Sequence, residues 1–315
     1  MKNKVESIDL VYLWVDGNDP QWQEKRNAFI GKIIENTETN CKGRYANNDE
    51  LKYSLRSAEK YAPWIRNIFI VTDNQTPSWL DATNPKIKII DHTEIMPEIC
   101  LPCFNSSVIE YFLYKIPDLS EHFLYANDDM FFNANVAPDF FFKKDGFPIV
   151  RLKKYLFEKI IYQFRTLLKK KPGQYRQKIA NANSLVKKKF GKNFSGLPHH
   201  CIDSYKKSDY RQAVENVFVE EVEKSLDSRM RKAGDFHRSA LSYYALAIGH
   251  GHLKYAGGQE SKRISAHKAD FMEQLFRYQP KLFCLNDSQR VKDEDRERIV
   301  PFLEKLFPKK SAFEK

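Results

Sequence analysis

The chain has 315 residues, of which 42% are hydrophobic and 14% aromatic. This composition excludes an intrinsically disordered protein, and the length suits one large domain or one domain with a substantial insertion. The formal net charge is +11, but residues 153–192 alone hold thirteen Lys or Arg against a single acid, Glu158. The positive charge is therefore regional, and the rest of the chain is close to neutral.

The first 150 residues alternate strand-like and helix-like segments. Apolar runs predict strands over residues 8–15, 67–73, 87–91 and 122–126, and helical periodicity predicts helices over 21–35, 50–61 and 106–115. This order is typical of an α/β domain in which crossover helices join parallel or mostly parallel strands. We therefore predict a Rossmann-like α/β core over residues 1–150.

A basic helical insertion is predicted next, over residues 151–197. Its segment 157–168 places apolar side chains at helical spacing with Lys and Arg between them. Such a helix either packs on the core with a solvated basic face, or meets acidic lipid headgroups or a phosphate-bearing polymer. No nucleic-acid-binding motif accompanies the charge, so nucleic acid is not an expected partner.

Residues 198–315 are predicted to complete the catalytic domain. Helical stretches are expected at 215–226, 239–248 and about 293–306, with one strand over "KLFCL" at 281–285. The sequence shows neither a secretory signal nor a run long enough to span a membrane, which favours a cytoplasmic protein. Peripheral contact with the inner face of the membrane would use residues 153–192.

The cysteine pattern indicates reduced thiols. Five cysteines, at 41, 100, 103, 201 and 284, are an odd number and too sparse for a disulfide scaffold. Cys100 and Cys103 form a lone C-x-x-C, and a structural zinc site would need a second ligand pair that the spacing does not supply.

Polar residues follow several predicted strands at the point where each strand ends. In "VYLWVDGNDPQW", residues 11–22, Asp16 and Asp19 come directly after an apolar run. On its own this stretch is a strand running into a turn, with Asp19-Pro20 starting a helix at Gln21. Open α/β sheets, however, bind ligands at the carboxyl ends of their strands, so Asp16 is a candidate for ligand contact.

The string "YANDDMFF" gives a second set of candidates: Asn127, Asp128 and Asp129. Two adjacent carboxylates between aromatic strands are costly unless they bind a cation or hydrogen-bond donors. Hard divalent cations prefer oxygen ligands and are held by one or two carboxylates together with substrate phosphates. The pattern therefore indicates a metal–diphosphate site, with a plain acidic turn as the alternative.

Two motifs in the second half carry groups suited to phosphoryl transfer. "LPHHCID" places His199 and His200 near Asp203, and "SRMRKAGD" places Arg231 near Asp235. Each motif alone is compatible with a purely structural role. Together they offer a base for an acceptor hydroxyl and a planar cation for the charge on phosphorus.

At this point the chain resembles a known family. "IDLVYLWVDGNDPQW", "RYANNDELKYSLRSAEKYAPWIRNIFIVTDNQTPSWL", "LPCFNSSVIEYFLYKIPDLSEHFLYANDDMFF" and "FCLNDS" are similar, in this order, to the conserved regions of Stealth proteins. The family comprises capsular polysaccharide phosphotransferases and the catalytic subunit of N-acetylglucosamine-1-phosphotransferase. The resemblance implies a glycosyltransferase-A-like fold. It also implies transfer of a sugar-1-phosphate from a UDP-sugar to an acceptor glycan, with release of UMP and formation of a phosphodiester.

The resemblance also implies the site. Asp128 and Asp129 would hold Mg²⁺ or Mn²⁺ against the diphosphate, and Asp16 would contact the donor. His200, oriented by Asp203, would deprotonate the acceptor hydroxyl, and Arg231 would stabilise charge on phosphorus. Further residues assigned to binding of the nucleotide sugar are Trp14, Gly17, Arg44, Arg56, Asn105, Ser106, Asn127, Asp235 and Asn286. Other positions that match the family's motifs are Asp19, Glu50, Ser57, Glu110 and Asp287.

The sequence departs from the family pattern in places. Cys103 stands where threonine is usual, Lys52 where arginine is frequent, and the residues before His200 differ from the usual His-x-Pro. The block 151–197 matches no family motif. This block is expected to contact either the acceptor or the membrane. The expected acceptor is a capsular or surface polysaccharide, including lipid-linked forms.

Two other functions fit the same residues. A metal-dependent glycosyltransferase would use "NDD" as its metal motif, attack the sugar carbon and release UDP instead of UMP. A non-catalytic protein that binds anionic surfaces or polysaccharide through residues 153–192 would bind in a salt-sensitive way without Asp128 or Asp129.

Overall fold

The computed structural model describes residues 7–30, 41–154, 173–232 and 234–315. Its central sheet has the strand order β3-β2-β1-β4-β8. The strands are β3 (Ile87–Asp91), β2 (Ile68–Thr72), β1 (Ile8–Leu13), β4 (His122–Asn127) and β8 (Asp203–Lys206). The first four are parallel and β8 pairs antiparallel with β4. The predicted α/β fold with a mostly parallel sheet is confirmed, and the 3-2-1-4 order is that of a Rossmann-like half.

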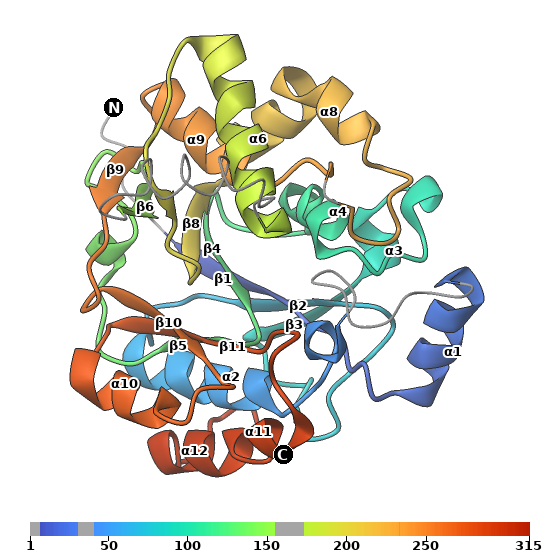
Figure 1. Ribbon diagram of the computed structural model, residues 1–315, viewed down its shortest axis with the longest axis vertical. Coiled ribbons are helices and arrows are strands. Elements are labelled where there is room, and N and C mark those ends of the chain that lie inside the picture. Colours follow the sequence, from blue (N-terminus) through green and yellow to red (C-terminus); the bar gives the residue numbers. More distant parts are fainter. Residues whose placement is uncertain (1–6, 31–40, 155–172, 233) are drawn as a thin grey trace, which may run out of the picture.

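Side chains of the sheet alternate between two cores. On one face, Leu10, Tyr12 and Ile70 pack against helix α2 (Glu50–Tyr61), whose bounds are the predicted ones. On the other face, Val11 and Val71 pack beneath α4 (Ser106–Glu110), α6 (Gln174–Phe190) and α9 (Ser239–Ala247). Figure 1 shows α2 below the sheet and α4, α6 and α9 above it. Both faces are covered, which explains why the inner strands β1, β2 and β4 are almost fully buried and mostly apolar.

The remaining helices of the described residues are short. They are α1 (Pro20–Ile30), α3 (His92–Ile95), α7 (Lys207–Gln212), α8 (Val219–Glu223), α10 (Phe271–Tyr278), α11 (Asp293–Arg296) and α12 (Ile299–Leu306). Pro20 begins α1, as expected from "DP", and residues 31–35 of that predicted helix lie outside the described residues. The helix predicted over 106–115 is shorter in the structure: α4 ends at Glu110, and a separate 3₁₀ turn follows at Leu113–Lys115. The helix predicted over 215–226 is a π-helical turn, Ala213–Val217, followed by α8.

The second half holds more strands than the sequence predicts. One small sheet joins β6 (Ile149–Lys153) to β7 (Leu197–Pro198) and β9 (His252–Tyr255), and another joins β11 (Leu282–Asn286) to β10 (Ser261–Ser265) and β5 (Met130–Phe132). Of these, β5 and β11 match the apolar runs "MFF" and "KLFCL", which were predicted as strands from the sequence, and both are fully buried. The strands β9 and β10 are short, polar and partly exposed, so they lack a periodic apolar signal.

Of the predicted basic insertion, residues 151–197, the structure describes residues 151–154 and 173–197. The predicted amphipathic segment 157–168 lies outside the described residues. Helix α6 buries Ile179, Ala182 and Val186, and it packs on α9 as part of the core. The proposed division at residues 150 and 197 stays a prediction.

Two further expectations concern cysteines and membrane spans. All five cysteines are buried and unpaired, in agreement with reduced thiols. Within the described ranges, no helix combines the length and the apolar character that crossing a membrane requires.

Candidate active site

The carboxyl ends of the strands open into a cavity that we call the inner chamber. Its walls come from the segments after β1, β4 and β11 and from the 43–46 and 103–109 segments. The backbone N–H of Leu285 donates to the carbonyl of Asp129 (2.9 Å), which brings the end of β11 to the turn after β4. Sequence-predicted residues that line this chamber are Trp14, Arg44, Ser106, Asn127, Asp128, Asp129, His200, Arg231 and Asn286.

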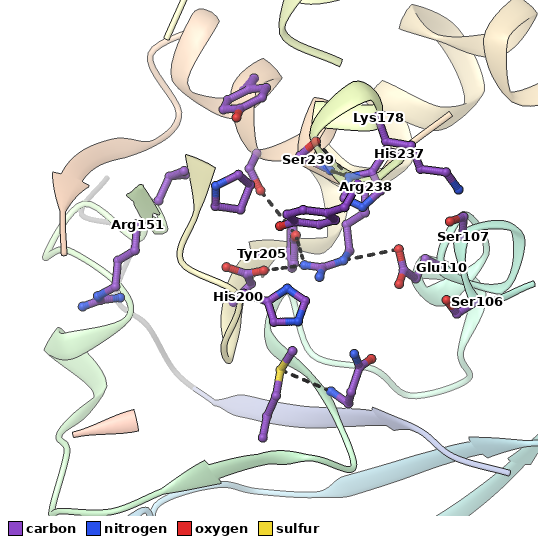
Figure 2. A pocket seen from close by; sticks show the side chains of 18 of the residues that line it. Ser106, Ser107, Glu110, Arg151, Lys178, His200, Tyr205, His237, Arg238 and Ser239 are labelled. Atoms are coloured by element: carbon purple, nitrogen blue, oxygen red, sulfur yellow. Dashed lines mark hydrogen bonds and ion pairs between the residues drawn. The ribbon is translucent and has the colours of Figure 1, made fainter. Parts of the chain in front are cut away.

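A second cavity, the outer chamber, adjoins the inner one beneath α6 and α9 (Figure 2). Residues that line both chambers form their common wall: Arg44, Ser106, Asn127, His200 and Arg231. The outer chamber adds Lys178, Arg238, Glu110 and Asp203. The two cavities are therefore two halves of one site, with His200 and Arg231 where they meet.

The 14–22 segment contributes to the inner chamber through packing. Trp14 and Trp22 line it, and the Trp22 ring lies 5.2 Å from that of Tyr45 and 5.4 Å from that of Phe104. The N–H of Gly17 donates to the carbonyl of Tyr45 (2.9 Å), and a Cβ at Gly17 would lie 2.0 Å from that oxygen. Only glycine permits this approach, so Gly17 acts by positioning Tyr45.

The two acids of this segment are engaged in local structure. The Asp16 carboxylate accepts a hydrogen bond from the N–H of Asn18 (2.9 Å), and Asp16 is outside the lining of either chamber. Asp19 accepts from the N–H of Gln21 (2.9 Å) and from the Gln75 amide (2.8 Å) at the start of α1. Donor contact by Asp16 stays a prediction.

Two half-buried carboxylates at the turn after β4, Asp128 and Asp129, lie close to the buried Glu50 of α2. Burial, followed by the charge of Asp129, raises the pKa of Asp128, and burial likewise raises the pKa values of Asp129 and Glu50. Asp129 accepts one hydrogen bond from the Cys284 thiol (3.2 Å), while its other oxygen is buried and has no partner among the described residues. A bound cation would relieve both the repulsion and the unsatisfied oxygen.

The donor set suits an ion that shares its ligands with substrate. Among the described residues, no group of three or more His, Cys, Asp or Glu is arranged to hold a metal ion. The unpartnered oxygen of Asp129 and the adjacent Asp128 carboxylate would fit Mg²⁺ or Mn²⁺ as a carboxylate pair, with water and phosphate oxygens as the other ligands.

His200 lies at the junction of the chambers in a backbone conformation that is rare outside glycine. Its φ is 55°, and its ring meets the Tyr175 ring edge-on at 5.5 Å. Burial and then the nearby Arg263 and Arg44 guanidinium groups lower the pKa of His200 to about 3. The imidazole is thus neutral at pH 7, and this low pKa makes it a weak base while those cationic charges are uncompensated.

Asp203 does not orient His200 as the sequence suggested. Its carboxylate accepts from His199 Nε2 (3.1 Å) and pairs with Arg238. His199 is buried, while the left-handed backbone at His200 leads the second histidine into the chambers. Asp203 therefore holds Arg238 and His199 in place, and the predicted pairing of Asp203 with His200 was wrong.

Arg231 is presented to the common wall by a buried network. One guanidinium nitrogen donates to the Ser106 hydroxyl (2.9 Å), and the other terminal nitrogen is buried without a partner among the described residues. The Asn105 amide donates to Asp235 (2.9 Å), which also accepts from the N–H of Lys232 (2.7 Å). Asn105 and Asp235 are therefore behind the chamber walls, where they hold the loop that carries Arg231.

Arg56 is placed elsewhere. It projects from α2 toward the C-terminal segment, where it forms a two-pronged ion pair with Glu314 (2.8 Å for each nitrogen) and contacts Glu304 (3.0 Å). It lies outside the lining of both chambers, so the structure gives it a stabilising role in place of the predicted one.

Three basic residues that line the outer chamber were not predicted as site residues: Arg151, Lys178 and Arg238. Figure 2 shows Arg238 in the middle of the chamber, between Tyr205 and Glu110. Its guanidinium lies 3.3 Å from Glu110 and donates to the Tyr205 hydroxyl (2.8 Å). No local motif marks these residues, and Lys178 was one among many lysines of the basic block.

Three segments of the chain match conserved regions of Stealth proteins: conserved region 1 at residues 6–33, conserved region 2 at 44–150 and conserved region 4 at 273–315. The chain is 31% identical to the capsular polysaccharide phosphotransferase WcwK of Streptococcus pneumoniae, over 98% of this chain and 100% of that protein. It is 34% identical to an exopolysaccharide phosphotransferase of Streptomyces coelicolor, over 98% of this chain and 51% of that protein. It is 32% identical to SacB of Neisseria meningitidis serogroup A, over 98% and 57%. The chain thus spans about half the length of the latter two relatives and all of WcwK.

Solved structures with a similar course of the chain include two glycosyltransferases. The galactosyltransferase LgtC, in complex with donor and acceptor sugar analogues, matches with a TM-score of 0.46 and 12% identity, over 94% of this chain and 95% of that one. GlyE of Streptococcus pneumoniae TIGR4 matches with a TM-score of 0.43 and 9% identity, over 95% and 60%.

Proposed function

Because the chain belongs to the Stealth family, whose relatives above are capsular and exopolysaccharide phosphotransferases, we propose that it transfers a sugar-1-phosphate. The donor is a UDP-hexose or UDP-N-acetylhexosamine, and the acceptor is a hydroxyl of a surface glycan. UMP is released, and a phosphodiester is formed. The observation that carries the proposal is the pair of adjoining chambers with His200 and Arg231 in their common wall.

The nucleotide sugar occupies the inner chamber in this proposal. Trp14, Trp22 and Tyr45 offer aromatic surface for the uridine. Asp128 and Asp129 would hold Mg²⁺ or Mn²⁺, which would neutralise the diphosphate and stabilise UMP as a leaving group. The diphosphate then lies near the common wall, within reach of cationic side chains.

The acceptor occupies the outer chamber, so that its hydroxyl meets the β-phosphorus at the common wall. The hydroxyl oxygen forms a bond to the β-phosphorus, and the bond from this phosphorus to the bridging oxygen of UMP breaks. The proton moves to the neutral imidazole of His200. The C1–O bond of the sugar is untouched, so the anomeric configuration is kept.

Substrate binding strengthens His200 as a base. Arg44 is one of the cations that lower its pKa, and a bound diphosphate would neutralise that charge. Arg231, which has no carboxylate partner among the described residues, stabilises the charge that develops on the phosphoryl oxygens. Asn105 and Asp235 keep Arg231 in place.

The nucleotide product tests this reaction. Purified protein with Mn²⁺, a panel of UDP-sugars and a surface-polysaccharide acceptor should release UMP and give a phosphodiester signal in phosphorus NMR. His200→Ala should lower the rate on the order of 10²- to 10⁴-fold without unfolding the protein. Release of UDP would instead identify a glycosyltransferase, and near-wild-type turnover by His200→Ala would remove the histidine from the mechanism.

A place at the inner face of the membrane, with peripheral contact through residues 153–192, remains part of this proposal. Co-sedimentation with vesicles that contain anionic lipid, at low and high salt, would test that contact.

A further inference from the structure

A third cavity, the side groove, opens from the outer chamber at the protein surface. It runs between α6, α8 and the 225–237 segment, and its described lining includes Lys178, Asn181, Leu185, Lys224, Lys232 and His237. Lys178 and His237 also line the outer chamber. Inner chamber, outer chamber and side groove therefore form one path, and the proposed reaction uses the first two parts of it.

Lys178 lies where the outer chamber meets the side groove. Its side chain is 8% exposed, and its ammonium group has one carboxylate partner among the described residues, Asp235, at 3.4 Å. Asp235 is already shared with Asn105 and the N–H of Lys232. A lysine ammonium has three donors, so this long contact leaves the buried cation incompletely compensated. Burial lowers the pKa of Lys178 in spite of Asp235, which agrees with such a position.

Helix α6 carries Lys178 on the same wall of the outer chamber as Tyr175, whose ring contacts that of His200. Gln174, Tyr175 and Lys178 all line the outer chamber from the first turns of the helix. The Tyr175 ring lies 5.5 Å from that of His200 and 5.9 Å from that of His237. Figure 2 shows Lys178 and His237 together on one side of the chamber, away from Arg151. A ligand whose hydroxyl reaches His200 can thus extend toward Lys178.

The cations indicate which ligand fits. Lys178 is joined in the side groove by the exposed Lys224 and Lys232, against the acids Glu221 and Asp235. A neutral glycan would need none of these ammonium groups. A glycan that already carries a phosphodiester, which is the product class of the proposed reaction, has an anion close to its accepting sugar.

We propose that Lys178 and the side groove bind the phosphodiester of the acceptor glycan nearest to its accepting hydroxyl. The inference rests on the proposed function for the identity of the acceptor, and it assigns a role to the basic block that no family motif covers. The protein therefore prefers acceptors that already contain the sugar–phosphate linkage over neutral glycans with the same terminal sugar.

Equilibrium binding separates this site from the reaction itself. The probes are a synthetic dihexose joined through a phosphodiester and the same dihexose joined through a glycosidic oxygen, titrated by calorimetry into the full chain. The wild type should bind the phosphodiester probe on the order of tenfold more tightly. Lys178→Met should abolish that preference, while Lys178→Arg should keep it and Lys188→Met, an exposed lysine on the same helix, should leave it unchanged.

Two further titrations distinguish the side groove from a folding defect and from the diphosphate site. The double variant Lys224→Glu/Lys232→Glu should weaken binding of the phosphodiester probe. Neither replaced side chain is part of the hydrogen-bond network around Asp235, which Lys232 joins through its backbone N–H. This variant therefore tests the side groove even if Lys178→Met fails to fold. Saturating UDP should leave the phosphodiester probe bound, because the diphosphate site is the inner chamber. Competition by UDP would place the probe phosphate in the diphosphate site and overturn the proposal.

Two more results would overturn it: equal binding of the two probes by the wild type, or a preference that survives Lys178→Met. UMP release from the UDP-sugar panel is measured in the same samples. If no UMP forms, the proposed function fails, and the binding comparison still decides the side groove.

Discussion

Gly17→Ala tests whether the 14–22 segment serves the inner chamber through Tyr45. The added Cβ would lie 2.0 Å from the Tyr45 carbonyl oxygen and 2.6 Å from the Tyr45 Cβ. The two backbones must separate by about 1 Å to reach even a tight contact, which breaks the Gly17–Tyr45 hydrogen bond of 2.9 Å. We expect a loss of about 1–3 kcal/mol in the free energy of unfolding. A displacement of this size in a substrate-positioning residue should lower kcat/KM for the UDP-sugar by about 10²-fold.

The assay is UMP release at varied UDP-sugar concentration, with urea unfolding of the same samples. Gly257→Ala is the matched control, because a Cβ at Gly257 meets nothing within 4 Å. A destabilised Gly17→Ala protein with wild-type kcat/KM for the donor would refute the link between this glycine and the chamber. An unchanged stability would refute the packing argument itself.

Further predictions address single contacts. Arg231→Lys should lower kcat by about 10²- to 10³-fold with little change in KM for the donor, since a point charge replaces the planar donor; an unchanged kcat in UMP release would contradict its role. EDTA should abolish turnover and Mn²⁺ restore it, and Asp129→Asn should raise the Mn²⁺ concentration for half-maximal rate; activity in EDTA would refute the metal site. Arg56→Met should cost about 3–5 kcal/mol at pH 7 in urea unfolding, because Glu314 stays buried without its partner. Burial alone would raise the pKa of Glu314, but the hydrogen bonds from Arg56 and Ser311 lower it more, so the pKa lies below its usual range. This stability is present above the ordinary glutamate pKa and is lost as pH falls through the lowered one, so the difference between Arg56→Met and wild type should shrink on acidification; a constant difference would contradict the pairing.

The sequence was informative where apolar patterning decides the structure. The strands β1, β2 and β4 were predicted because each is a buried apolar run, and helix α2 because it is amphipathic. The edge strand β3 is only partly buried and was predicted from its isoleucines. The convergence of Trp14 and Asn127 to Asp129 on one cavity follows from the parallel order of these strands. The short polar strands β9 and β10 carry no such signal.

Other parts of the site depend on contacts that no local pattern encodes. Arg56 and Glu314 are far apart in the chain, so nothing in the motif around Arg56 shows that it faces the C-terminal segment. Likewise, "HHCID" does not tell which histidine meets Asp203, because the left-handed backbone at His200 decides it. Lys178 is indistinguishable in sequence from the lysines that stay in solvent.

The arrangement of charge in the site favours binding of a metal ion together with a nucleotide. Asp128 and Asp129 crowd beside the buried Glu50 at the inner chamber, whereas Arg44 and Arg231 lie in the common wall and Lys178 lies in the outer chamber. Among the described residues, Arg231 has no carboxylate partner and Lys178 has one. A metal ion would relieve the repulsion among the carboxylates, and phosphate oxygens would pair with the cations. Saturating Mn²⁺ with UDP, at about a hundred times the dissociation constant, should therefore stabilise the fold by about 2.7 kcal/mol. The same addition to Asp129→Asn should stabilise it less, and an equal rise in the melting temperature of both proteins would show that the nucleotide is held without the carboxylate pair.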